Sequence, residues 1–220
     1  PSAKYEAAGN AGIINIRLRK NKAFGTNGSV NAGWAIGTYP KYNGGFTLNN
    51  RNSKTNLFGM FNYNNNKNLN TMNLFRTVAD TSFNQTNKMT NDGQNATYKA
   101  GLDYFINKKS TMGFMVNGSA GGNNLSSVSN TPITYLPTDS VVKILTANNT
   151  NDMKRRNVSA NANYRYTDTT GRELSMDADY AYYYNYSNQV QPNIYYDETG
   201  INEISRIEYN MIAPTNINLY

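Results

Sequence analysis

The stretch "NVSANANYRY", residues 157–166, alternates between polar and apolar residues without a break. Its apolar members are Val158, Ala160, Ala162, Tyr164 and Tyr166. Its polar members are Asn157, Ser159, Asn161, Asn163 and Arg165. Because successive side chains of a β-strand point to opposite faces of a sheet, this period of two predicts a strand with one apolar and one polar face.

The same alternation recurs along the chain. Six further segments show it: residues 29–36, 42–49, 57–64, 97–104, 111–120 and 173–184. The stretch "TNINLY", residues 215–220, predicts the beginning of an eighth strand. None of the seven apolar faces contains a charged residue, although charged residues make up 16% of the chain. We expect consecutive strands to pair as an antiparallel meander.

The composition supports an all-β fold. Hydrophobic residues make up 38% and charged residues 16% of the chain, and both fractions are low for a globular domain. Much of the remainder is polar and uncharged, with 39 Asn, 17 Gly and 18 Tyr. Asn and Gly favour turns and Tyr favours strands, so we predict many strands joined by turns rather than a helix bundle.

The absence of two residue types bears on catalysis. The chain has no Cys and no His, so it lacks thiolate metal ligands, disulfides and the commonest general base. We therefore expect no enzymatic activity, no cofactor, and neither catalytic nor metal-binding residues.

The net charge of +7 could indicate nucleic acid or an anionic surface. Basic residues cluster only at 17–22 and 153–157, where strands meet their connections. We interpret these clusters as solvated strand ends and expect no nucleic acid as a partner. No apolar run approaches the ~20 residues of a transmembrane helix, whereas a transmembrane β-strand needs only ~9–11 residues.

The apolar faces are typical of a transmembrane barrel. Small Gly and Ala residues occupy their middles and Tyr or Phe lies near their ends, as in barrels with aromatic girdles. We expect these residues to face lipid: Trp34, Phe46, Leu102, Phe114, Ala162 and Met176. We expect these to point to the interior: Asn31, Thr47, Asp103, Asn117, Asn161 and Asp177. The alternative is a soluble all-β binding domain, which also hides one face of each strand.

The predicted connections differ in length. Those around 51–54, 107–110 and 167–171 are short, whereas 65–95, 122–155 and 185–214 would be loops of ~30 residues. Long loops on one side of a membrane and short turns on the other would produce this alternation. The stretches "SNTPITYLPT" and "NYSNQVQPNIYY" would then bring Tyr and Pro into loops, to stack on a ligand or partner, or to fold on themselves.

A family resemblance follows from three stretches. "PSAKYEAAGNAGIINIRLRKN", residues 1–21, resembles the junction between plug and barrel in TonB-dependent outer-membrane receptors. "NLFGMFNYN" and "GLDYFINKKSTMGF" resemble early strands of the outer membrane β-barrel subfamily of these receptors. The resemblance implies that residues 1–22 are the C-terminal end of a plug domain. It implies that residues 23–220 are the N-terminal part of a transmembrane β-barrel of which seven to eight strands are present.

The resemblance also implies a function and a location. The chain would be a fragment of an energy-coupled receptor in the Gram-negative outer membrane, which captures a ligand at extracellular loops and imports it through a plugged barrel. Its partners would be outer-membrane lipid, the remainder of its own plug and barrel, an energy-coupling inner-membrane complex and a surface partner protein. The alternative is a non-transporting barrel scaffold that holds partner proteins in a complex.

The polar faces of two strands supply the candidate ligand-binding residues. They are Asn157, Ser159, Asn161, Asn163, Arg165, Asp177 and Asp179. Two carboxylates at positions i and i+2 of a strand, such as Asp177 and Asp179, can share a hard cation. The other interpretation pairs these carboxylates with cations of the Lys99 or Arg165 kind from neighbouring strands or from the plug.

Overall fold

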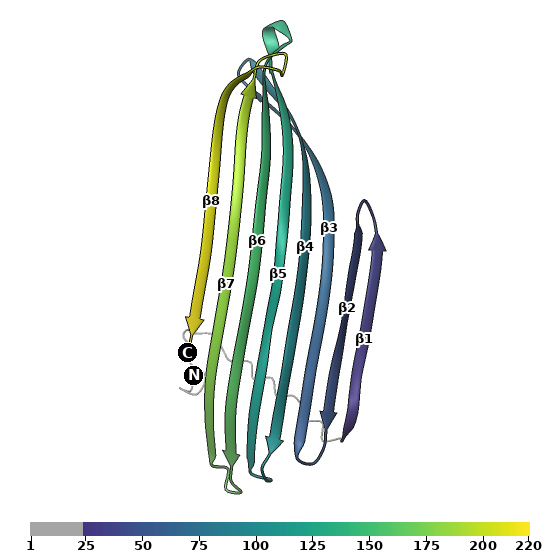
Figure 1. The fold of residues 1–220 in the computed structure, drawn as a ribbon, viewed down its shortest axis with the longest axis vertical. Helices are drawn as coiled ribbons and strands as arrows, with labels where there is room; N and C mark the ends of the chain where they lie inside the picture. The colour runs from purple at the N-terminus through teal and green to yellow at the C-terminus, as the bar shows by residue number, and fades with distance from the viewer. Residues whose placement is uncertain (1–23) are drawn as a thin grey trace.

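The computed structural model describes residues 24–220, which form one antiparallel sheet of eight strands (Figure 1). The strands are β1 (Gly25–Ile36), β2 (Pro40–Arg51), β3 (Thr55–Val78), β4 (Thr81–Phe105), β5 (Ser110–Tyr135), β6 (Ser140–Thr167), β7 (Glu173–Tyr196) and β8 (Glu203–Leu219). One 3-10 turn, η2 (Leu136–Thr138), joins β5 to β6. Each strand pairs with the next in sequence, which confirms the antiparallel meander. The predicted plug segment, residues 1–22, lies outside the described residues.

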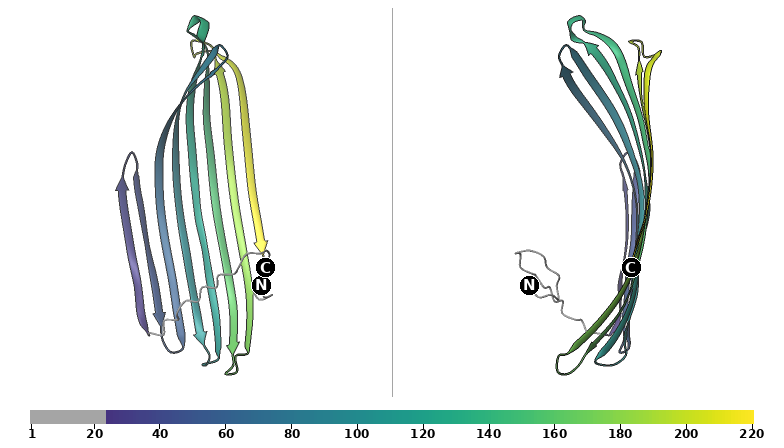
Figure 2. Two further views of the ribbon diagram at one scale, coloured as in Figure 1. Left: turned by 180° about the vertical axis from the view of Figure 1, so that it is seen from behind. Right: turned by 90° about the vertical axis from the view of Figure 1, so that its left-hand side faces the viewer.

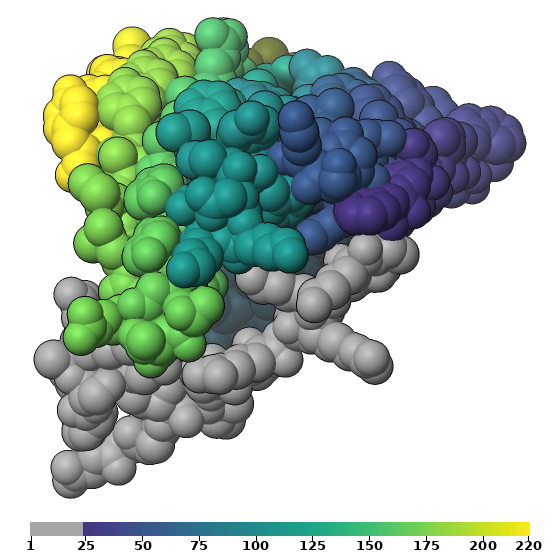
Figure 3. Space-filling view, turned by 90° about the horizontal axis from the view of Figure 1, so that it is seen from below, coloured from purple at the N-terminus to yellow at the C-terminus, as the bar shows by residue number. Residues whose placement is uncertain are grey.

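The sheet is open and curved. Among residues 24–220, β1 and β8 form its two edges and do not pair with each other. In side view the two ends of the sheet bend toward the same side (Figure 2). Seen from its lower end, the colours follow the chain order across the molecule, from purple at one side to yellow at the other (Figure 3). The predicted fold class is thus confirmed, and the curved, open sheet is consistent with part of a barrel.

The pairing register separates two faces of the sheet. Leu102 pairs with Phe114, and Phe114 pairs with Ala162, so these three share one face. The same reasoning places Trp34, Phe46 and Met176 with them, and we call this side the apolar face. The opposite side, the polar face, carries Asn31, Thr47, Asp103, Asn117, Asn161 and Asp177. Contact of the apolar face with lipid remains a prediction.

Three connections share the lower end of the sheet in Figure 1 and are short, as predicted around 51–54, 107–110 and 167–171. Asparagine and aspartate side chains fix them. The Asn107 Oδ1 accepts hydrogen bonds from the backbone N–H groups of Lys109 and Ser110, at 2.8 and 2.9 Å. Such side-chain acceptors replace the missing strand partners at a turn.

The three predicted long loops are wrong. Residues 65–95, 122–155 and 185–214 lie almost entirely in strands, which continue to turns at 79–80, 136–139 and 197–202. Asn70 pairs with Met89 and Gly122 pairs with Lys154, deep inside two of the predicted loops. The stretches "SNTPITYLPT" and "NYSNQVQPNIYY" accordingly belong mainly to β5 and β7.

Cross-strand polar contacts explain why these segments remain extended. Gln85 Nε2 donates to Ser129 Oγ at 2.8 Å, and Ser127 Oγ donates to Asn87 Oδ1 at 2.8 Å. Backbone pairing requires no apolar side chain. Where apolar contacts are missing, hydroxyl and amide pairs across strands stabilise the sheet instead. The alternation of apolar residues in the sequence therefore ends before the strand itself ends.

The turn between β7 and β8 is held by one carboxylate. Asp197 accepts hydrogen bonds from Thr199 Oγ1 and Asn202 Nδ2, each at 2.6 Å. These bonds lower the pKa of the Asp197 carboxyl to about 2. The carboxyl therefore stays ionised, and keeps these hydrogen bonds, at any pH well above this value.

Strand β8 begins earlier in the sequence than predicted, and most of its apolar residues lie on the polar face of the sheet. It begins at Glu203, so the prediction that the strand begins at "TNINLY" is wrong, and that stretch forms its end. Ile217 pairs with Tyr183 on the polar face, whereas Asn218 lies on the apolar face and accepts a hydrogen bond from Tyr180 Oη at 3.1 Å. The amphipathic pattern of β8 is therefore inverted relative to β7.

Candidate functional site

The candidate residues of β6 form hydrogen bonds with β5 on the polar face. Asn157 Nδ2 donates to Ser119 Oγ at 2.7 Å, and the Ser119 backbone N–H donates to Asn157 Oδ1 at 3.0 Å. One step along the same face, Ser159 Oγ donates to Asn117 Oδ1. The register brings these pairs together because Asn157 lies opposite Ser119 and Ser159 lies opposite Asn117.

The next residues of β6 connect to β7. Asn161 Nδ2 donates to Asp179 Oδ1 at 2.8 Å, and Asn163 Nδ2 donates to Asn161 Oδ1 at 2.8 Å. Asp177 accepts a hydrogen bond from Ser175 Oγ at 3.2 Å. The polar face therefore carries a line of amide, hydroxyl and carboxylate groups across β5, β6 and β7.

Within residues 24–220, Asp177 and Asp179 form no ion pair with a cation of a neighbouring strand, and the pairing with the plug that we also considered lies outside these residues. Arg165 Nε lies 3.0 Å from Glu173 Oε1, which makes Glu173 its partner. Lys99 Nζ lies 5.7 Å from the centroid of the Phe58 ring. Among residues 24–220, no group of three or more acidic side chains is placed to hold a metal ion. Asp177 and Asp179 are instead held by neutral neighbours.

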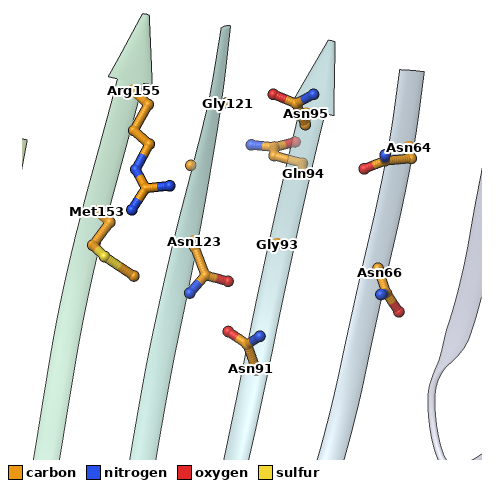
Figure 4. Close-up of a pocket in the computed structure, with 11 residues that line it drawn as sticks. Asn64, Asn66, Asn91, Gly93, Gln94, Asn95, Gly121, Asn123, Met153 and Arg155 are labelled. Atoms are coloured by element: carbon orange, nitrogen blue, oxygen red, sulfur yellow. The ribbon is translucent and has the colours of Figure 1, made fainter. Parts of the chain in front are cut away.

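A hollow of about 350 Å³ continues the polar face beyond these residues, at the height where β3 to β6 leave the predicted strand segments (Figure 4). Its lining comes from four adjacent strands and includes Asn64, Asn66, Asn91, Asn95, Asn123 and Arg155. Figure 4 shows the Arg155 guanidinium beside Gly121, with the amides of β3 and β4 on the other side. Amides both donate and accept hydrogen bonds, so the hollow can bind a polar molecule.

Two observations characterise this hollow. At Gly121, a Cβ atom would lie 2.7 Å from Asn95 Oδ1, so the absence of a side chain provides the space that the amide occupies. Asn91 Oδ1 is buried and has no hydrogen-bond partner among residues 24–220. A buried acceptor without a partner is costly, so a ligand or a water molecule that donates to it would be stabilising.

A second hollow of about 420 Å³ lies further along the polar face. Gln85, Asn87, Ser127 and Ser129 contribute to its lining, together with the rings of Phe83 and Tyr195. Neither hollow could be predicted from the sequence, because most of the lining residues fall in segments predicted as loops. The run of Asn residues at 64–66 was the only hint of a polar surface there.

The apolar face ends at a set of charged residues, which we call the charged row: Lys67, Asp92, Asp152, Lys154 and Arg156. Lys67 Nζ lies 2.9 Å from Asp92 Oδ2, and Lys154 Nζ lies 3.5 Å from Asp152 Oδ2. The register places Lys67 opposite Asp92 and Asp92 opposite Asn124, with Asn124 opposite Asp152. Lys67, Asp92 and Asp152 therefore lie at one height, with the uncharged Asn124 between them on β5. Lys154 and Arg156 lie at the next positions of the same face toward the lower end.

No protein-family model, curated protein or solved structure matches the chain. No helix within residues 24–220 has the length and apolar character needed to cross a membrane.

Proposed function

We propose that the chain is part of the wall of an outer-membrane receptor that binds a polar ligand and imports it through an energy-coupled, plugged barrel. The apolar face contacts lipid and the polar face lines the interior. The main support is the height of the uncharged part of the apolar face. On β6 it extends from Val158, the next residue of that face after Arg156, to Tyr166, a span of nine residues, which matches the ~9–11 residues that cross a bilayer.

The lengths of the strands place the rest of the sheet outside the bilayer. β3 to β7 contain 24 to 28 residues each, more than twice what a bilayer requires. The excess lies at and beyond the charged row. The hollow near Arg155 is at the height of this row, and the second hollow of the polar face lies beyond it. In this proposal the ligand is captured by the amide-lined hollow near Arg155, and not by long flexible loops. The short turns face the periplasm.

A second candidate function, a scaffold that holds a partner protein, has support from one edge. β2 pairs with β3 only as far as Asn66, so the remainder of β3 has an open edge within the described sheet. Met72, Leu74 and Phe75 are 47%, 49% and 67% exposed there. Unpaired strand edges with apolar side chains bind extended segments of other chains.

An uptake experiment with the full-length receptor tests the proposal. Cells with and without its gene are compared for uptake of ferric chelates, oligosaccharides and peptides, with and without a proton gradient across the inner membrane. We expect uptake of one class to require both the gene and the gradient. N123L should then lower this uptake about tenfold, because the hollow loses an amide and gains an apolar group.

The matched control is N124L. Asn124 is the next residue of β5 and lies on the opposite face, so uptake should be unchanged. If no class of compound depends on the gene, while a partner protein co-purifies with the receptor and is lost after L74D/F75D, the scaffold function is correct instead.

A further inference from the structure

A hollow of about 580 Å³ lies on the apolar face at the level of the charged row. Lys154 and Arg156 of β6 stand at one side of it and Tyr63 of β3 stands at the other. Gly122 lies opposite Lys154, and Ala120 lies opposite Arg156. Because β5 contributes almost no side-chain volume here, the space beside the two cations stays open.

The charges around this hollow are unevenly balanced. Lys67 and Asp92 neutralise each other at 2.9 Å. Lys154 is 3.5 Å from Asp152, which is a looser pair between exposed groups. Arg156 is exposed and forms no ion pair with any carboxylate of residues 24–220. The β6 side of the hollow therefore presents a guanidinium and an ammonium group against a single carboxylate, which complements an anion.

The aromatic neighbours fit the boundary of a membrane. Lys154 Nζ lies 5.7 Å from the centroid of the Tyr186 ring. Tyr63 forms part of the opposite wall. Tyr residues are enriched where hydrocarbon meets headgroups, and Lys and Arg there reach toward lipid phosphates. Below the hollow lies the uncharged part of the apolar face, so a bound headgroup would continue into acyl chains that lie against β4 and β5.

We propose that this hollow binds the phosphate-bearing headgroup of an anionic membrane lipid, with Lys154 and Arg156 as the phosphate ligands. The proposal rests on the membrane placement of the apolar face given above. An arginine can donate two parallel hydrogen bonds to phosphate, and a lysine adds a point charge. A soluble phosphate would lack the acyl chains that contact the apolar face.

Native mass spectrometry of the full-length receptor tests this site. The protein is transferred into micelles that contain equal amounts of phosphatidylglycerol and phosphatidylcholine, and the retained lipids are counted. We expect a preference for phosphatidylglycerol. K154Q/R156Q should lower its retention at least about fivefold, since each basic residue near a membrane surface strengthens binding by about that factor. G122L, which fills the hollow and leaves both cations in place, should also lower retention.

The matched control is R155Q. Arg155 precedes Arg156 in β6 but lines the hollow of the polar face, so its replacement should leave lipid retention unchanged. Equal retention in all variants, or equal loss in R155Q and K154Q/R156Q, would overturn the site. Displacement of the lipid by inorganic phosphate, without any preference between the two lipids, would identify a free-anion site and also overturn it.

Incorporation into bilayers separates the two proposals. A receptor that incorporates into vesicles but shows no effect of K154Q/R156Q retains its proposed function and loses only the headgroup site. A receptor that stays soluble without detergent loses both.

Discussion

At the scale of single residues, glycines within the strands make room for large neighbours. A Cβ atom at Gly118 would lie 2.6 Å from Tyr98 Oη and would also meet the backbone carbonyl oxygen of Asn157. Tyr98 lies directly opposite Gly118 in the sheet, so the ring covers the glycine. At Gly59, on the same face, a Cβ atom would come no closer than 3.5 Å to the carbonyl oxygen of Lys99.

These two positions give a matched pair of substitutions. Gly118→Ala should destabilise the protein by about 1–3 kcal/mol, because Tyr98 and the facing backbone must move to admit the methyl group. Gly59→Ala should be neutral or stabilising by up to about 1 kcal/mol, because the methyl group fits and the unfolded chain loses freedom. Urea unfolding of both variants measures the difference. Equal destabilisation of the two variants would contradict the role assigned to Tyr98.

At the scale of elements, the upper halves of the long strands continue the pairing of their lower halves. The pairing of β3 with β4 runs without a break from Thr55 opposite Tyr104 to Val78 opposite Thr81. Replacement of residues 70–89 by Asn-Gly, which favours a two-residue hairpin turn, joins the opposed residues Leu69 and Thr90 and should leave the lower sheet in register. Replacement of residues 70–88 by the same turn should shift β4 by one residue and reverse its faces.

Introduced cysteines at Leu57 and Leu102, which lie opposite each other, report the register. The chain contains no other cysteine, so the only disulfide formed within it is the one between these positions. This disulfide should form when residues 70–89 are replaced and should fail to form when residues 70–88 are replaced. Crosslinking in both variants would mean that the turn does not control the pairing.

The same elements show how far the sequence alone could predict the fold. The strict alternation at residues 157–166 and 111–120 is strong enough to assign the faces of β6 and β5 correctly. Beyond Gly122 both faces of β5 carry mainly polar residues, and the few apolar ones, such as Leu125 and Val128, fall on different faces, so no apolar period of two marks the strand. The hollow near Arg155 could not be predicted for this reason, since its lining depends on the register of strands that the sequence did not indicate.

At the scale of the whole molecule, the two faces should differ in their surroundings. A fluorophore attached at F114C should be quenched by a lipid with a brominated acyl chain, and one at N117C should be quenched by aqueous iodide. The two residues are three apart in β5 and therefore lie on opposite faces. The measurement uses the protein reconstituted in vesicles. Iodide quenching at both positions, with no effect of the brominated lipid, would place the apolar face outside the membrane.

The unbroken meander has a consequence for how the chain folds. Every strand finds its partner in the strand made just before it, across a connection of a few residues. The mean separation in sequence between contacting residues therefore depends on the length of a hairpin. It does not grow with the number of strands. Sheets built in this way have a low relative contact order for β-proteins, which favours faster folding than pairings between distant segments. Each hairpin can be added to the growing edge in turn, as the ribosome releases it or as a membrane receives it.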